Sequence, residues 1–139
     1  MTIRTDIIKA IHQKLANLAD GHVYVSRAAP FDSDIDKAIV IRKHYDKLVE
    51  KAVHHRQFLV SIDVFVRSSD DTPADEISDE IMELVSKTMA EFTANGGAHK
   101  MHPRCVACQE VEHRWEISDT PDDVAIQNAI FAISYRAEY

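Results

Sequence analysis

The sequence predicts an α+β fold in which two α-helices pack on a largely antiparallel or mixed β-sheet of four or five strands. Two segments carry apolar residues at three- and four-residue intervals, which indicates amphipathic helices. Other segments alternate apolar and polar residues with a period of two, which is typical of strands with one buried face. The 139 residues are expected to form a single domain, residues 1–139, with the element order α-β-β-β-α-β-β.

The first element is a helix predicted over residues 3–19. Thr2 or Thr5 can cap its first turn with a side-chain oxygen. Asp20-Gly21 is expected to end it, because glycine readily adopts the left-handed backbone that follows a last helical turn. Its apolar residues form one stripe that would face the core: Ile3, Ile7, Ile8, Ile11, Leu15 and Leu18.

Two short strands and a long connection are predicted next. The strands are expected at residues 22–26 and 37–42, separated by an acidic loop that contains Pro30. Residues 43–56 are mostly polar, and a helical turn or an extended hairpin arm would each fit part of them. We interpret them as a long connection, a feature that is often functional in a small domain.

The strand at residues 58–67 is predicted to bury one whole face. Leu59 and Phe65 lie on its opposite face, which indicates contact there with another subunit. The buried face would carry five apolar residues at a period of two: Phe58, Val60, Ile62, Val64 and Val66.

A second helix is predicted over residues 73–94. Thr72 can cap it, Pro73 fits its first helical position, and Asn95-Gly96-Gly97 would end it. Two strands are expected to follow, at residues 104–118 and 124–139. The first would place on one face Cys105, Ala107, Val111, Trp115 and Ile117, and the second Phe131, Ile133 and Tyr135.

Composition disfavours several classes of protein. The chain has 16 basic and 23 acidic residues, a net charge of −7, and no basic stripe of the kind that reads nucleic acid. No apolar run approaches the ~20 residues of a membrane span, so no membrane partner is expected. The first residues include an acid and lead into the predicted helix, unlike a signal peptide. The two cysteines are expected to be free thiols.

One run holds four possible zinc ligands within ten residues: His99, His102, Cys105 and Cys108. Structural zinc half-sites are usually separated by about a dozen residues or more, so that two loops can surround the ion. On a strand, the odd spacing of the cysteines would also point them to opposite faces and leave Cys108 a surface thiol. We therefore expect no metal, with a small zinc-binding module as the alternative.

No catalytic constellation is recognisable in the sequence. It contains no phosphate-binding glycine loop, no metalloprotease motif and no nucleophile elbow. His54-His55 is interpreted as part of a solvated face, and His113, near Trp115, as a hydrogen-bonded and half-buried side chain. We expect neither enzymatic activity nor a cofactor.

The order and spacing of these elements resemble those of the tail terminator proteins of long-tailed bacteriophages, the lambda-like minor tail protein U family. The resemblance extends over nearly the whole chain and rests on order and spacing. It is carried by a first helix that ends near Gly21, the loop Ala29-Pro30-Phe31-Asp32, the run Ala38-Ile39-Val40-Ile41, the strand Phe58–Arg67 with Ser68-Ser69-Asp70-Asp71 and a long helix after it, and the final strand from Ala129 to Tyr139.

The resemblance implies a structural virion protein with no catalytic residues. Such proteins form a homo-hexameric ring on the finished tail tube, stop its polymerisation and present the surface that joins the head. The implied partners are copies of the same chain, the tail tube protein and a head-completion or connector protein. The implied location is the virion tail, after assembly in the host bacterial cytoplasm. Another head-tail connector or neck protein is the alternative.

Five residues are candidates for partner binding. Lys47, Lys51 and Arg56 form a local group of basic residues in an acidic chain, and such a patch can orient docking onto an acidic surface. Leu59 and Phe65 are candidates for apolar contact with another subunit, because they lie on the strand face opposite the predicted core.

Overall fold

The computed structural model describes residues 2–25, 36–50, 54–68, 72–116 and 124–137. Five strands form one mixed sheet in the order β1-β2-β3-β5-β4, in which β1 is parallel to β2 and the other pairs are antiparallel. The predicted fold class and element order are confirmed. The elements are α1 (Ile3–Leu15), β1 (Val23–Val25), β2 (Lys37–Glu50), β3 (His55–Arg67), α2 (Ala74–Thr93), β4 (Cys105–Glu116) and β5 (Val124–Arg136), with short 3₁₀ helices at Ala19–Gly21 and Gly97–Lys100.

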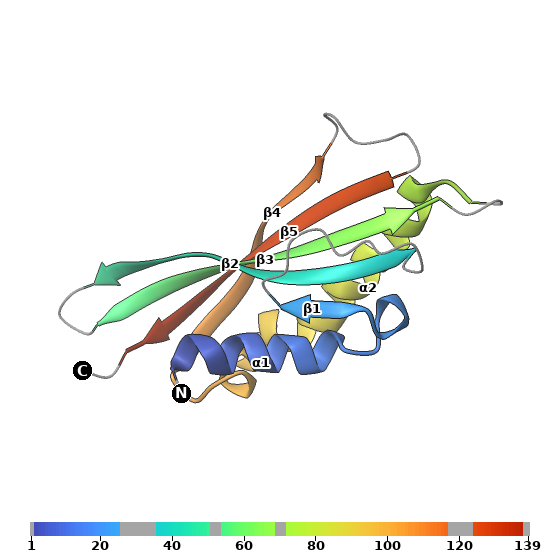
Figure 1. Ribbon diagram of the computed structural model, residues 1–139. Helices are drawn as coiled ribbons and strands as arrows, with labels where there is room; N and C mark the ends of the chain where they lie inside the picture. The colour runs from blue at the N-terminus through green and yellow to red at the C-terminus, as the bar shows by residue number, and fades with distance from the viewer. Residues whose placement is uncertain (1, 26–35, 51–53, 69–71, 117–123, 138–139) are drawn as a thin grey trace.

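Both helices pack on the same face of the sheet (Figure 1). The apolar stripe of α1 is buried as predicted, and α2 turns Ile81, Val85 and Met89 toward the sheet. The even-numbered residues of β3 from 58 to 66 are almost completely buried beneath them. The alternation in the sequence therefore identified the inner face of the central strand correctly.

The two helices begin and end close to their predicted bounds, with two differences. Thr2 caps α1, and its hydroxyl oxygen accepts a hydrogen bond from the Thr5 backbone N–H at 3.1 Å. This helix ends at Leu15, earlier than predicted, and cannot run on to residue 19, because Leu18 is extended (φ −78°, ψ 164°) and Ala19 and Asp20 have φ angles of 49° and 55°. A right-handed helix cannot continue through that backbone conformation. In α2, Pro73 occupies the N-cap position and not the first helical position.

The backbone at the end of α2 requires glycine at positions 96 and 97. Gly96 has a φ of 78°, which favours glycine because it has no Cβ. A Cβ at Gly97 would lie 1.9 Å from the carbonyl oxygen of Glu91, so only glycine fits there without a shift of the backbone. These contacts agree with the predicted helix end at Asn95-Gly96-Gly97.

Residues 43–56 were predicted to be a long connection, and this prediction is wrong. β2 continues to Glu50 and β3 begins at His55, so the two strands form a hairpin that projects beyond the helices (Figure 1). We call residues 43–50 and 54–57 the arm. Its register shifts between Lys43 and Tyr45 and again between Leu48 and Glu50. Each bulge adds one unpaired residue and breaks the period of two.

The predicted faces of β4 are also wrong, for the same physical reason. Its register with β5 shifts between Cys105 and Ala107 and between Glu110 and Glu112. The first bulge brings Cys105 and Cys108 to the same face, where both are buried against the helices. Cys108 is therefore not a surface thiol. Val111 is exposed, and Trp115 is 56% exposed instead of packed in the core.

We expect both thiols to resist Ellman's reagent in the folded protein at pH 8 and to react once the chain is denatured. Burial raises the pKa of Cys105 to about 12, and burial together with the neighbouring Cys105 raises the pKa of Cys108 to about 12. The attacking thiolate is then scarce at pH 8 and shielded as well. Absorbance at 412 nm before and after adding guanidinium measures this. If one thiol per chain reacted rapidly with the reagent before unfolding, the buried position of Cys108 would be contradicted.

Candidate interaction surface

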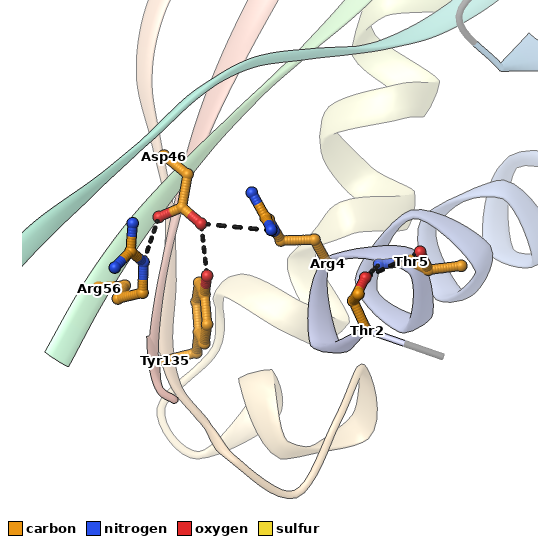
Figure 2. Close-up of polar contacts among 6 residues, drawn as sticks. All are labelled: Thr2, Arg4, Thr5, Asp46, Arg56 and Tyr135. Carbon is orange, nitrogen blue, oxygen red and sulfur yellow. Dashed lines mark hydrogen bonds and ion pairs between the residues drawn. The ribbon is translucent and has the colours of Figure 1, made fainter. Parts of the chain in front are cut away.

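The base of the arm is held by a cluster of polar side chains centred on Asp46. Its carboxylate is 7% exposed and accepts hydrogen bonds from Arg56 Nε at 3.3 Å and from the Tyr135 hydroxyl. Arg4 Nε, from the first turn of α1, lies 3.6 Å from the same carboxylate. Figure 2 shows these side chains converging from β2, β3, β5 and α1. The cluster thus connects the arm to the first turn of α1 and to the end of β5.

The phenol of Tyr135 is kept protonated in this cluster. Burial, and then the hydrogen bond to Asp46, raise its pKa from 10.0 to about 12. Since the folded pKa lies above the unfolded one, the contribution of Tyr135 to stability is complete below pH 10 and is lost as the pH rises through 12. The phenol therefore keeps the proton that it donates to Asp46 at neutral pH.

The arm exposes apolar and basic side chains on both sides of this cluster along β2. Tyr45, Leu48 and Val49 are 47%, 40% and 52% exposed. Lys43 and Lys47 are exposed as well. Large exposed apolar side chains on a projecting hairpin are a surface that a partner can cover. The arm is thus the best candidate in the described part of the chain for a contact with another protein.

The structure does not bring the predicted partner-binding residues into one patch. Lys47 is exposed on the arm, whereas Arg56 is bound to Asp46, and Lys51 lies outside the described residues. Leu59 is half-buried, and Phe65 is only 6% exposed within the single chain. Tyr45, which is exposed and is paired with Leu59 on β3, was not predicted as a contact residue. The bulge between Lys43 and Tyr45 shifts the alternation of β2, so the sequence did not show which face Tyr45 lies on.

Phe65 lies beside a second buried carboxylate on the sheet face opposite the helices. Asp63 accepts hydrogen bonds from Ser61 and from Asn128 Nδ2 at 2.7 Å, and it pairs with Arg42 Nε at 3.1 Å. The Arg42 guanidinium in turn lies 5.8 Å from the centre of the Phe65 ring. The charges of Asp63 and Arg42 therefore neutralise each other within the chain. The cluster connects β2, β3 and β5.

The four residues considered as zinc ligands do not converge. Both cysteines are inside the core, while His99 Nδ1 lies 3.1 Å from the Pro103 carbonyl oxygen and His102 Nδ1 accepts the Arg104 N–H at 3.0 Å. No group of three or more His, Cys, Asp or Glu residues forms a possible metal site within the described ranges. The residues present do not fit a zinc site.

His113 is hydrogen-bonded but more exposed than predicted. Its Nε2 lies 2.8 Å from Gln127 Oε1, and its ring stacks on Trp115 with 4.5 Å between the ring centres. Gln127 is buried and donates in turn to Ser78 and Asp79 at the start of α2. The chain of contacts joins β4 to α2 and gives the histidine a structural role.

A groove of about 470 Å³ lies between α1 and the β1 side of the sheet. His12 is fixed at its wall, where Nε2 lies 3.1 Å from the Val23 carbonyl oxygen. Among the described residues its lining contains no carboxylate or thiol, so these residues offer no metal ligand set and no nucleophile paired with a base. The lining residues are Thr5, Ile8, Lys9, His12, Gln13, Val25 and Lys43.

The fold and this surface define a small mixed-sheet α+β domain with a projecting hairpin arm. A chain in the solved structure described as the "Virion of native gene transfer agent (GTA) particle" has a similar fold. The TM-score is 0.65 at 13% sequence identity, and the match covers 98% of this chain and 98% of that chain. No protein-family model and no curated protein sequence matches the chain. Within the described residues, no helix is long and apolar enough to cross a membrane.

Proposed function

We propose that this protein is a structural, non-enzymatic component of a phage-like virion, and specifically a tail terminator. In this role copies of the chain form a ring on the finished tail tube, stop its growth and present the surface that meets the head. Its partners are further copies of the chain, the tail tube protein and a head-completion protein.

The observation that carries this proposal is the likeness in fold to a chain of a gene transfer agent virion over 98% of both chains. A likeness over the full length of both chains supports a protein that acts as a single domain and is part of a larger particle. The order of elements, with a long central strand followed by one long helix, agrees with the resemblance to the tail terminators. The projecting arm supports assembly, because it offers apolar side chains to a neighbouring molecule.

Deleting the gene in the phage or prophage that carries it tests the proposal. We expect overlong tails without heads in electron micrographs of lysates, because tube subunits continue to add when nothing caps the tube. A plasmid copy of the wild-type gene should restore tails of normal length.

Two other outcomes of the deletion would contradict the terminator role. Tails of normal length without heads would identify a connector or neck protein that acts after the tail is complete. Normal virions would exclude a role in tail completion altogether. Tail length and head attachment are counted on the same grids, so one experiment separates the three cases.

A further inference from the structure

We infer that the arm of one copy of this protein binds the acidic outer face of α2 on the next copy, so that the copies join head to tail. The arm and this helix face differ in charge, both expose apolar side chains, and they lie at opposite ends of the sheet. The inference rests on the self-association in the proposed function and adds the two surfaces that make the contact.

The arm is basic although the chain is acidic. The arm, residues 43–50 and 54–57, contains three basic and two acidic side chains, a net charge of +1, whereas the whole chain has a net charge of −7. Among the described residues, Asp46 is already neutralised by Arg56 and Arg4. Lys47 is exposed beside Tyr45 on the sheet face opposite the helices, and Lys43 and Leu48 are exposed on the helix face. The arm therefore offers a lysine and an apolar side chain on each face to an acidic partner.

The outer face of α2 has the opposite character. The helix contains six acidic residues and one basic residue, a net charge of −5. Its exposed acidic residues lie in the first half of the helix, and they are Asp75, Glu76, Asp79, Glu80 and Glu83. Leu84, which is 48% exposed, follows directly after them, one turn from Glu80. Within the described contacts, Glu83 alone of these acidic residues pairs with a basic side chain, that of Lys87. An acidic surface with an apolar side chain at its edge complements an arm that has apolar side chains and lysines.

The geometry excludes this contact within one chain. The arm projects at one end of the sheet, and the first half of α2 lies at the other end (Figure 1). A contact between two different surfaces on separate copies is heterologous, and it closes into a ring when the rotation between copies allows. The Asp46 cluster favours this contact, because it holds the arm in one direction before binding and so reduces the conformational entropy lost.

A charge-swap experiment tests the inference on purified full-length protein. Variant A carries Lys43→Glu and Lys47→Glu on the arm, and variant B carries Glu80→Lys and Glu83→Lys on α2. We expect the wild type to form oligomers in sedimentation velocity and light scattering. Each variant alone should need at least a roughly tenfold higher concentration to assemble, since like charges then face each other at every contact.

The decisive measurement is an equimolar mixture of A and B. The acidic arm of A then meets the basic helix of B, and the basic arm of B meets the acidic helix of A. We expect oligomers to return in the mixture with the two variants alternating. The chain that carries all four substitutions should also assemble by itself. Circular dichroism checks that each variant keeps the wild-type fold, and Tyr45→Ser should weaken assembly without changing the charge.

Three results would overturn the inference. They are a wild type that stays monomeric at its highest soluble concentration, a variant A that assembles like the wild type, and a mixture that stays dissociated while each variant is folded. These results leave the tail-length test untouched. Overlong tails in the deletion strain together with a failed charge swap would keep the terminator role and reject this interface. Assembly restored in the mixture of A and B, together with tails of normal length in the deletion strain, would keep this interface and reject the terminator role.

Discussion

Replacing Ile81 with aspartate is expected to destabilise the protein by about 3–5 kcal/mol, because it places an unpaired charge between α2 and the sheet. Ile81 is 7% exposed and belongs to the cluster of apolar residues that the two helices share with β3 and β5. No basic side chain in the described core is placed to pair with the new carboxylate. Urea denaturation followed by circular dichroism measures the free energy of unfolding.

Leu84→Asp is the matched control, since it introduces the same charge on the same helix three residues later. Leu84 is largely exposed, so at dilutions where the protein is monomeric the change should be within about 0.5 kcal/mol. Equal destabilisation by the two substitutions would mean that α2 does not pack as described. Wild-type stability of Ile81→Asp would mean that this side chain faces water.

Replacing Asp46 with alanine is expected to cost about 2–3 kcal/mol and to loosen the arm. The substitution removes the acceptor for the Tyr135 hydroxyl and Arg56 and the partner of Arg4, and a buried hydroxyl left without a partner is itself costly. Arg4 and Arg56 are partly exposed and can turn toward water, which keeps the loss moderate. Hydrogen exchange should rise in residues 43–50 before it rises in the core.

Glu50→Ala is the control for Asp46→Ala, because it removes an acidic side chain from the same strand at an exposed position. It should leave both the free energy of unfolding and the exchange in the arm within error of the wild type. If Asp46→Ala exchanged no faster in the arm than Glu50→Ala, the cluster would not be what holds the arm in place.

The sequence predicted the layers of this fold well and its bulged strands poorly. The helices were found because their apolar stripes recur without interruption over many turns, and the central strand because five apolar residues alternate along it. β4 and the outer part of β2 each contain two bulges. A bulge shifts the alternation by one residue, so the pattern points to the wrong face from that residue onward.

The candidate surface was predicted only in part. Lys47 was identified from its charge, and it is exposed on the arm. Arg56 was grouped with it, because a sequence does not show that Arg56 meets Asp46, Tyr135 and Arg4 at one point, each from a different element. The partners of Asp46 are distant along the chain, in the first turn of α1 and at the end of β5, so the sequence predicted a connection where the structure has the arm.

The bulges in β4 limit how far the sheet can extend. β4 is an outer strand, and a long, flat outer strand would accept a strand from any other molecule and continue into a fibre. The extra residues Val106 and Val111 interrupt its row of backbone donors and acceptors at two places. A regular strand cannot pair along such an edge without losing hydrogen bonds. The irregularity that shifted the alternation in the sequence thus protects this acidic protein against amyloid-like aggregation at this edge.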